Sequence, residues 1–154
     1  MADELQVDFY CGNFRGTFDG SYRLLVPKDW RPEGGPTQFM VIPWPFDKEQ
    51  ADYLSVLPVE LYAKICRHVA EHSLFNDSMS AFKRAMASSA KKVEFDKFGR
   101  IALSQTLLEE AGIQDEAALV GVVDHFEIWQ PERFRAIRPI DKQTAAQVKP
   151  SFPI

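Results

Sequence analysis

Two short stretches place an aspartate four residues before an arginine, each in a loop between strand-like runs. The first covers residues 19–23 (DGSYR) and the second covers residues 96–100 (DKFGR). The guanidinium group of arginine is a planar fork of hydrogen-bond donors that suits a phosphate or the O6/N7 edge of guanine. The spacing therefore favours recognition of an anion or a nucleic acid, with Arg23 and Arg100 as the binding side chains.

Positive charge gathers around these loops, although the chain as a whole is acidic. The net charge of −4 at pH 7 by itself argues against DNA, whose backbone attracts cations. However, Lys91, Lys92 and Lys97 all lie close in sequence to the second loop. We therefore predict that the residues that bind DNA are Arg23, Lys91, Lys92, Lys97 and Arg100.

Four further residues are expected to shape the loops rather than to touch DNA. DNA would repel Asp19 and Asp96, so we expect each carboxylate to accept loop N–H groups or to fix the direction of its arginine. Gly20 and Gly99 suit backbone positions with positive φ. The alternative interpretation is a pair of exposed loops, each with a surface ion pair that contributes little to stability.

A second candidate site is the pattern H-x-x-E-H at residues 68–72 (HVAEH), on a predicted helix. This pattern is typical of one group of zinc hydrolases, because it places two histidines on one helical face. A catalytic zinc needs a third protein ligand, and the remaining histidine, His125, lies in a strand-like stretch. We therefore predict no metal, no cofactor and no catalytic residue, with a metal hydrolase that uses His68, Glu71 and His72 as an alternative.

The two loops belong to a longer pattern that occurs twice. Setting Asp19 on Asp96 aligns the flanking residues without a gap, and residues 54–62 match residues 126–134 further on. Each copy is predicted to contain a β-hairpin with the loop at its tip, a short helix, two strands, and a helix that begins with a proline. An internal duplication explains this order.

The predicted domain organisation follows from the duplication. The first repeat lies in the segment 1–75, from about residue 10, after an N-terminal extension and with its first strand at residues 10–18. The second repeat covers residues 76–137. Residues 138–154 contain three prolines and no periodicity, so a flexible C-terminal tail is predicted there.

Two helices are predicted between the copies. From residue 58 to about residue 73, apolar side chains recur at helical spacing and form one stripe: Leu61, Tyr62, Ile65, Cys66 and Val69. Asn76 or Asp77 can cap a second helix, whose apolar face includes Phe82 and Met86. These faces are expected to pack in the core or against another subunit.

Length and composition favour a compact chain in the cytoplasm. The 154 residues include 45% hydrophobic residues, enough for a core in one domain or two very small ones. The acidic N-terminus leads into no apolar segment, so no signal peptide is expected. No apolar run is long enough to span a membrane, so no membrane partner is expected.

Together, the loops, the strands and the order of elements resemble the MraZ family of bacterial transcriptional regulators. The resemblance extends from about Tyr10 to Ile137, and it is strongest at residues 96–101 (DKFGRI), 119–121 (LVG) and 126–129 (FEIW). It implies a mainly β fold with peripheral helices, in which the two repeats form an AbrB-like double-split β-barrel.

The resemblance also implies a function. Members of this family form ring-shaped homo-oligomers that bind direct repeats in a promoter and regulate division and cell-wall genes. For this chain it implies a DNA-binding repressor in the cytoplasm, associated with the nucleoid, with no small-molecule substrate. An AbrB-like protein-interaction module of the antitoxin type, which would use residues 138–154 to hold a partner, is the other alternative.

The first loop departs from the family pattern. Ser21 and Tyr22 stand where the family has Lys-Gly, which removes a cation and places a bulky residue where glycine eases the turn, unless Gly20 takes that role. Residues 14–16 (FRG) look like a motif at the start of the family, but the spacing from Asp19 selects residues 10–12 (YCG) instead. We therefore expect the second loop to carry more of the binding.

Overall fold

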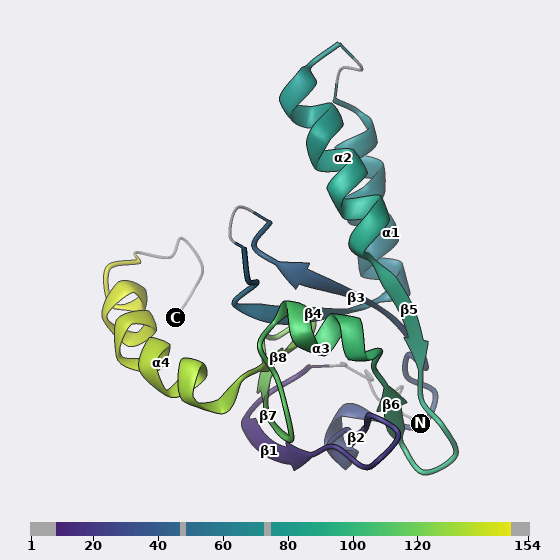
Figure 1. The fold of residues 1–154 in the computed structure, drawn as a ribbon, viewed down its shortest axis with the longest axis vertical. Coiled ribbons are helices and arrows are strands. Elements are labelled where there is room, and N and C mark those ends of the chain that lie inside the picture. Colours follow the sequence, from purple (N-terminus) through teal and green to yellow (C-terminus); the bar gives the residue numbers. More distant parts are fainter. Residues whose placement is uncertain (1–8, 47–48, 73–74, 149–154) are drawn as a thin grey trace, which may run out of the picture.

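The computed structural model describes residues 9–46, 49–72 and 75–148, and Figure 1 shows how its elements are arranged. Up to residue 75 they are β1 (Asn13–Thr17), β2 (Arg23–Leu25), the 3-10 helix η1 (Lys28–Trp30), β3 (Gln38–Trp44), β4 (Tyr53–Pro58) and α1 (Val59–Ala70). From residue 76 they are α2 (Asp77–Ser89), β5 (Lys91–Glu94), β6 (Arg100–Ala102), α3 (Gln105–Glu110), β7 (Glu116–Gly121), β8 (Phe126–Trp129) and α4 (Pro131–Ala145). Apart from α2, the two halves have the same order of elements.

The described strands form two antiparallel sheets. A six-stranded sheet has the order β1-β7-β8-β4-β3-β5, and a two-stranded sheet pairs β2 with β6. β1, β3 and β4 of the first half correspond to β5, β7 and β8 of the second half. If each strand of the large sheet is exchanged for its counterpart, the same order results, read from the opposite edge. The halves are therefore interleaved in one sheet, and the prediction of a mainly β fold with peripheral helices is confirmed.

The prediction that each loop closes a β-hairpin is wrong. β5 enters the second loop but pairs with β3, and β6 leaves that loop but pairs with β2. In the first half, β1 pairs with β7. Local alternation cannot reveal such an exchange, because a strand has the same apolar pattern whichever neighbour it pairs with.

The first strand is shorter than the predicted range of residues 10–18. β1 covers residues 13–17, and Tyr10 makes only an isolated bridge to Val123. Gly12 separates the two with a φ of 94°, outside the range of a strand. This left-handed residue redirects the chain and ends the ladder.

One core joins the two halves. The largest fully buried side chains come from both halves and include Trp30, Phe39, Leu24, Phe126, Ile101 and Leu119. The ring of Phe126 lies 5.0 Å from that of Trp30 and 5.8 Å from that of Phe39, measured between centroids. Neither half can bury its own apolar residues without the other.

The helices α1 and α2 form an antiparallel pair that projects from the sheets (Figure 1). Asn76 caps α2, since its Oδ1 accepts a hydrogen bond of 3.0 Å from the N–H of Met79. The apolar stripes of the pair pack together above Ile42 and Leu57, yet Met86 is the only buried residue of either helix. The pair therefore leaves much apolar surface only half-buried.

The predicted flexible tail is wrong for residues 138–145, which belong to α4. Phe134 and Ile137 anchor the helix against Trp129 and its neighbours. Pro139 lies inside the helix, where a proline removes one backbone hydrogen bond without ending the helix here. Residues 149–154 of the predicted tail lie outside the described residues. No helix in the described ranges has the length and apolar character to cross a membrane.

Replacing Phe126, whose ring packs near those of Trp30 and Phe39, should destabilise both halves together. We expect Phe126→Ala to lower the free energy of unfolding by about 3–5 kcal/mol, the usual cost of emptying a buried aromatic site. Phe98→Ala is the matched control, because that ring is 58% exposed. Urea unfolding followed by fluorescence measures both, and an equal loss in the two variants would contradict the shared core.

Candidate nucleic-acid interface

Pairing of β2 with β6 places the two loops side by side. Leu24 lies opposite Ile101 in the register, and both side chains are fully buried beneath the loops. Two further backbone hydrogen bonds link each loop to the residues that follow the other loop. The N–H of Leu103 donates to Tyr22 O at 3.0 Å, and the N–H of Val26 donates to Gly99 O at 3.1 Å. The loops therefore form one surface.

In the first loop, Asp19 holds both the backbone and its arginine. Its Oδ1 accepts hydrogen bonds from the N–H groups of Ser21 at 2.9 Å and Arg23 at 3.0 Å. Its Oδ2 accepts one from Nε of Arg23 at 2.8 Å. The carboxylate thus closes the loop and fixes the plane of the guanidinium group.

The second loop repeats these contacts. Oδ1 of Asp96 accepts from the N–H groups of Phe98 at 2.8 Å and Arg100 at 2.9 Å, and its Oδ2 accepts from Nε of Arg100 at 2.8 Å. Equivalent carboxylates therefore hold equivalent arginines, although the residues between them differ in the two loops.

Both carboxylates are stabilised in their charged form. The backbone hydrogen bond from Arg23 is the main cause that lowers the pKa of Asp19, and the one from Arg100 lowers the pKa of Asp96. Partial desolvation opposes the shift in each case. At neutral pH each loop therefore contains a full ion pair, so its Asp and Arg together add no net charge.

The left-handed position of each loop directly precedes its arginine. Gly99 has a φ of 83°, and Tyr22 has a φ of 58° at the equivalent place. Gly20 is not among the residues with positive φ, so the idea that it takes over the role of the missing glycine is wrong. Tyr22 adopts the strained conformation itself, which side chains with a Cβ rarely do.

Exposed cations and one aromatic ring surround the second loop. The ring of Phe98 lies 5.2 Å from Nζ of Lys97 and 5.0 Å from Cζ of Arg100, measured to its centroid. Lys91 and Lys92 are exposed on β5, which leads into this loop. Successive strand residues point to opposite faces, so only one of these two lysines can share a face with the loops.

Arg31 belongs to this surface, although sequence reasoning did not select it. Its Nε donates to Val26 O at 2.8 Å, and its guanidinium group covers Gly99 so closely that a Cβ there would collide with it. The sequence signal was only a positive residue after the short helix of the first half. Its place over the second loop depends on the cross-pairing of β2 and β6.

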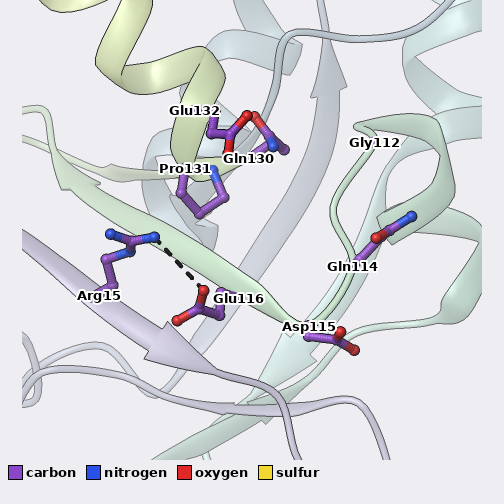
Figure 2. A pocket seen from close by; sticks show the side chains of 8 residues that line it. All are labelled: Arg15, Gly112, Gln114, Asp115, Glu116, Gln130, Pro131 and Glu132. Carbon is purple, nitrogen blue, oxygen red and sulfur yellow. Dashed lines mark ion pairs between the residues drawn. The ribbon is translucent and has the colours of Figure 1, made fainter.

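A separate polar hollow lies beside β1 and the start of α4, and Figure 2 shows its lining. Arg15 pairs there with Glu116 at 3.7 Å, and each side chain is 54% exposed. Asp115 and Glu132 also line the hollow. Three of its four charged lining residues are acidic, which does not suit DNA, and Arg15 is already paired.

The H-x-x-E-H pattern does not form a metal centre among the described residues. His68 is exposed on α1 and His72 is exposed just after the end of that helix, with ring centroids 6.1 Å apart. Within residues 9–46, 49–72 and 75–148, no group of three or more histidine, cysteine, aspartate or glutamate side chains could hold a metal ion.

Comparison with known proteins points to one family. Residues 86–148 match the family model described as "MraZ protein, putative antitoxin-like". A transcriptional regulator MraZ of Leuconostoc mesenteroides is 31% identical over 82% of this chain and 85% of the relative. One of Lactobacillus gasseri is 34% identical over 81% and 83%. One of Mycoplasma mobile is 27% identical over 84% of each chain.

The left-handed position should tolerate substitution differently in the two loops. We expect Gly99→Ala to destabilise the protein by about 1–2 kcal/mol or more, because a Cβ is strained at this φ and collides with Arg31. Tyr22→Gly relieves the same backbone strain, but glycine also has a greater conformational entropy in the unfolded chain. Because the two effects oppose one another, we expect the free energy of unfolding to change by no more than about 1 kcal/mol. Denaturant unfolding of both variants tests this, and an equal loss in the two would contradict it.

Proposed function

This chain belongs to the MraZ family, and we propose on that premise that it is a transcriptional regulator that binds DNA through its two paired loops. The observation that carries the proposal is the repeated geometry of those loops, in which an aspartate fixes an arginine on each side of the β2–β6 pair. Members of the family are named as regulators rather than as enzymes, and we infer no catalytic role.

The ion pairs leave the guanidinium groups able to bind DNA. Each aspartate occupies Nε, which is one of the five donors of the arginine. The side chains of Arg23 and Arg100 are 39% and 26% exposed. A pre-oriented arginine loses less conformational freedom on binding a phosphate or a guanine edge than a free one does.

The positive charge of the interface comes from other side chains. Since each Asp–Arg pair is neutral, attraction to the DNA backbone depends on Lys97, Arg31 and a lysine of β5. Their number is small, so a single subunit should bind weakly and binding should fall with salt. Several subunits that act together would raise the affinity through effective concentration.

We propose that such an assembly is a ring-shaped homo-oligomer. The half-buried apolar side chains of α1 and α2 favour a partner surface, and identical head-to-tail interfaces close into a ring when the rotation between neighbours divides a full turn. Neighbouring loops would then recur at a fixed interval, which suits direct repeats spaced by about 10 bp. We further propose that the protein acts in the cytoplasm at the nucleoid, as a repressor of division and cell-wall genes.

The antitoxin alternative changes with the structure. It relied on residues 138–154 as a disordered tail, but residues 138–145 form the second half of α4. Ile140 is exposed on that helix, and Val148 is exposed beyond its end. A partner that contacts Ile140 would meet a helix rather than a disordered segment.

Substitution of the loop arginines should weaken DNA binding more than substitution of an arginine elsewhere. We expect Arg100→Ala and Arg23→Ala each to lower affinity about tenfold or more and to reduce the slope of affinity against salt. Arg100→Ala should cost more, because Lys97 and Phe98 flank only that loop. Arg15→Ala is the control for charge, since it removes the same cation from the hollow beside β1.

The measurement is fluorescence anisotropy across a salt series, with duplexes from the region upstream of the division cluster in the same genome. The duplexes carry two or more direct repeats, one repeat, or a palindrome. Equal losses in Arg15→Ala and Arg100→Ala, or palindromes that bind as well as direct repeats, would rule out the loops as the recognition surface.

The assembly should depend on the apolar stripe of α1. We expect light scattering to give a mass of several subunits, and Ile65→Ser to shift it towards the 17.6 kDa monomer. Lys64→Ser is the control on the exposed side of the same helix. Circular dichroism checks that both variants are folded, and a monomeric wild-type protein at micromolar concentration would remove the ring.

A further inference from the structure

The two loops share their hydrogen-bond pattern except at one contact. Oδ2 of Asp19 lies 2.8 Å from Nε of its own Arg23 and also 3.5 Å from Nη1 of Arg100, in the other loop. Within the part of the chain that the structure describes, Asp96 has no matching contact with Arg23. One carboxylate therefore serves both arginines, and the other serves only one.

This contact leaves the two arginines in different environments. Arg100 has a carboxylate at Nε and a second carboxylate at Nη1, and its side chain is 26% exposed. Among the described residues, Arg23 has a carboxylate at Nε only, and its side chain is 39% exposed. The position of Arg100 thus depends on the first loop as well as on its own.

We propose that Asp19 is a positioning residue of the DNA interface, which holds Arg100 in a fixed relation to Arg23 so that the loops act as one unit. The inference rests on the proposed function, because it assigns a role within that interface. The backbone bonds between the loops fix the two main chains, whereas the Asp19 carboxylate fixes the side chains that reach beyond them.

The lengths of the contacts indicate how the unit would bind a phosphate. Charge-assisted N–H···O bonds are usually about 2.7–2.9 Å long, so the 2.8 Å bond from Arg100 to Asp96 sets the plane of the guanidinium group, and the longer 3.5 Å contact with Asp19 limits how far that plane can turn. The two contacts occupy two of the five N–H donors of Arg100. A phosphate can therefore bind at the remaining donors while both carboxylates stay in place.

Double-mutant cycles across the loops test this role. Asp19→Asn keeps the acceptor for the loop N–H groups but removes the charge, and Arg100→Lys keeps the charge but removes the fork. We expect their effects on DNA affinity to be coupled by about threefold or more. Asp96→Asn with Arg23→Lys is the matched pair without a contact, and its effects should be additive within about twofold.

The contact between Asp19 and Arg100 can also be measured without DNA. Arg100→Gln should raise the pKa of the Asp19 carboxyl, followed by nuclear magnetic resonance, because it removes a neighbouring cation. Arg23→Gln should leave the pKa of the Asp96 carboxyl unchanged. A loss of the Asp19 response, or equal coupling in the two DNA cycles, would overturn the inference.

The two measurements separate this inference from the proposed function. Suppose that the wild-type protein binds no operator but the Asp19 pKa still responds to Arg100→Gln. The proposed function and the role of Asp19 in DNA binding are then both wrong, while the contact between Asp19 and Arg100 is still supported. If operator binding is intact and the Asp19 pKa does not respond, only that contact is wrong.

Discussion

The pairing of β2 with β6 is the constraint on which the rest of the structure depends. These strands are only three residues long, and each begins at the arginine of one of the two Asp–Arg loops. Their apolar side chains Leu24 and Ile101 are fully buried in a core that both halves share. Because the strands pair with each other rather than with β1 and β5, those outer strands remain available to the six-stranded sheet. The same exchange that completes the core therefore brings the two loops to one surface.

The interleaving also explains why near-identical loops acquire different surroundings. Backbone hydrogen bonds repeat across the pair almost contact for contact, so the duplicated main chain is nearly symmetric. The side chains are not: Gly99 is covered by Arg31, whereas Tyr22 carries its own ring at the equivalent position. Asp19 reaches an arginine of the other loop. The differences between the two loop sequences thus change which side chains the loops present, while the backbone fold is the same in both.

Sequence reasoning succeeded where a feature is local and failed where it depends on distant pairing. The repeated order of elements, the mainly β class and a cap for α2 at Asn76 or Asp77 follow from short-range patterns, and the structure agrees, with Asn76 as the cap. Alternation along each strand could not predict the exchange, because it does not specify which strand is the neighbour. The continuation of α4 through Pro139 was missed because proline usually ends a helix, although packing of Phe134 and Ile137 holds the helix in place. Arg31 was missed because its place over the second loop depends on the pairing of β2 with β6.

Electrostatics sets a limit on how such an interface can recognise DNA. An acidic chain with two internally neutral Asp–Arg pairs has little net attraction for a phosphate backbone. Those aspartates would be a disadvantage if charge alone determined binding, since removal of either would leave a free cation. They are intelligible if the direction of each guanidinium group matters more than its charge, because a carboxylate at Nε fixes the plane in which the other donors lie. If the proposed interface binds DNA, it would therefore bind weakly to DNA in general and discriminate by geometry, so that affinity would come from the number of loops that engage at once.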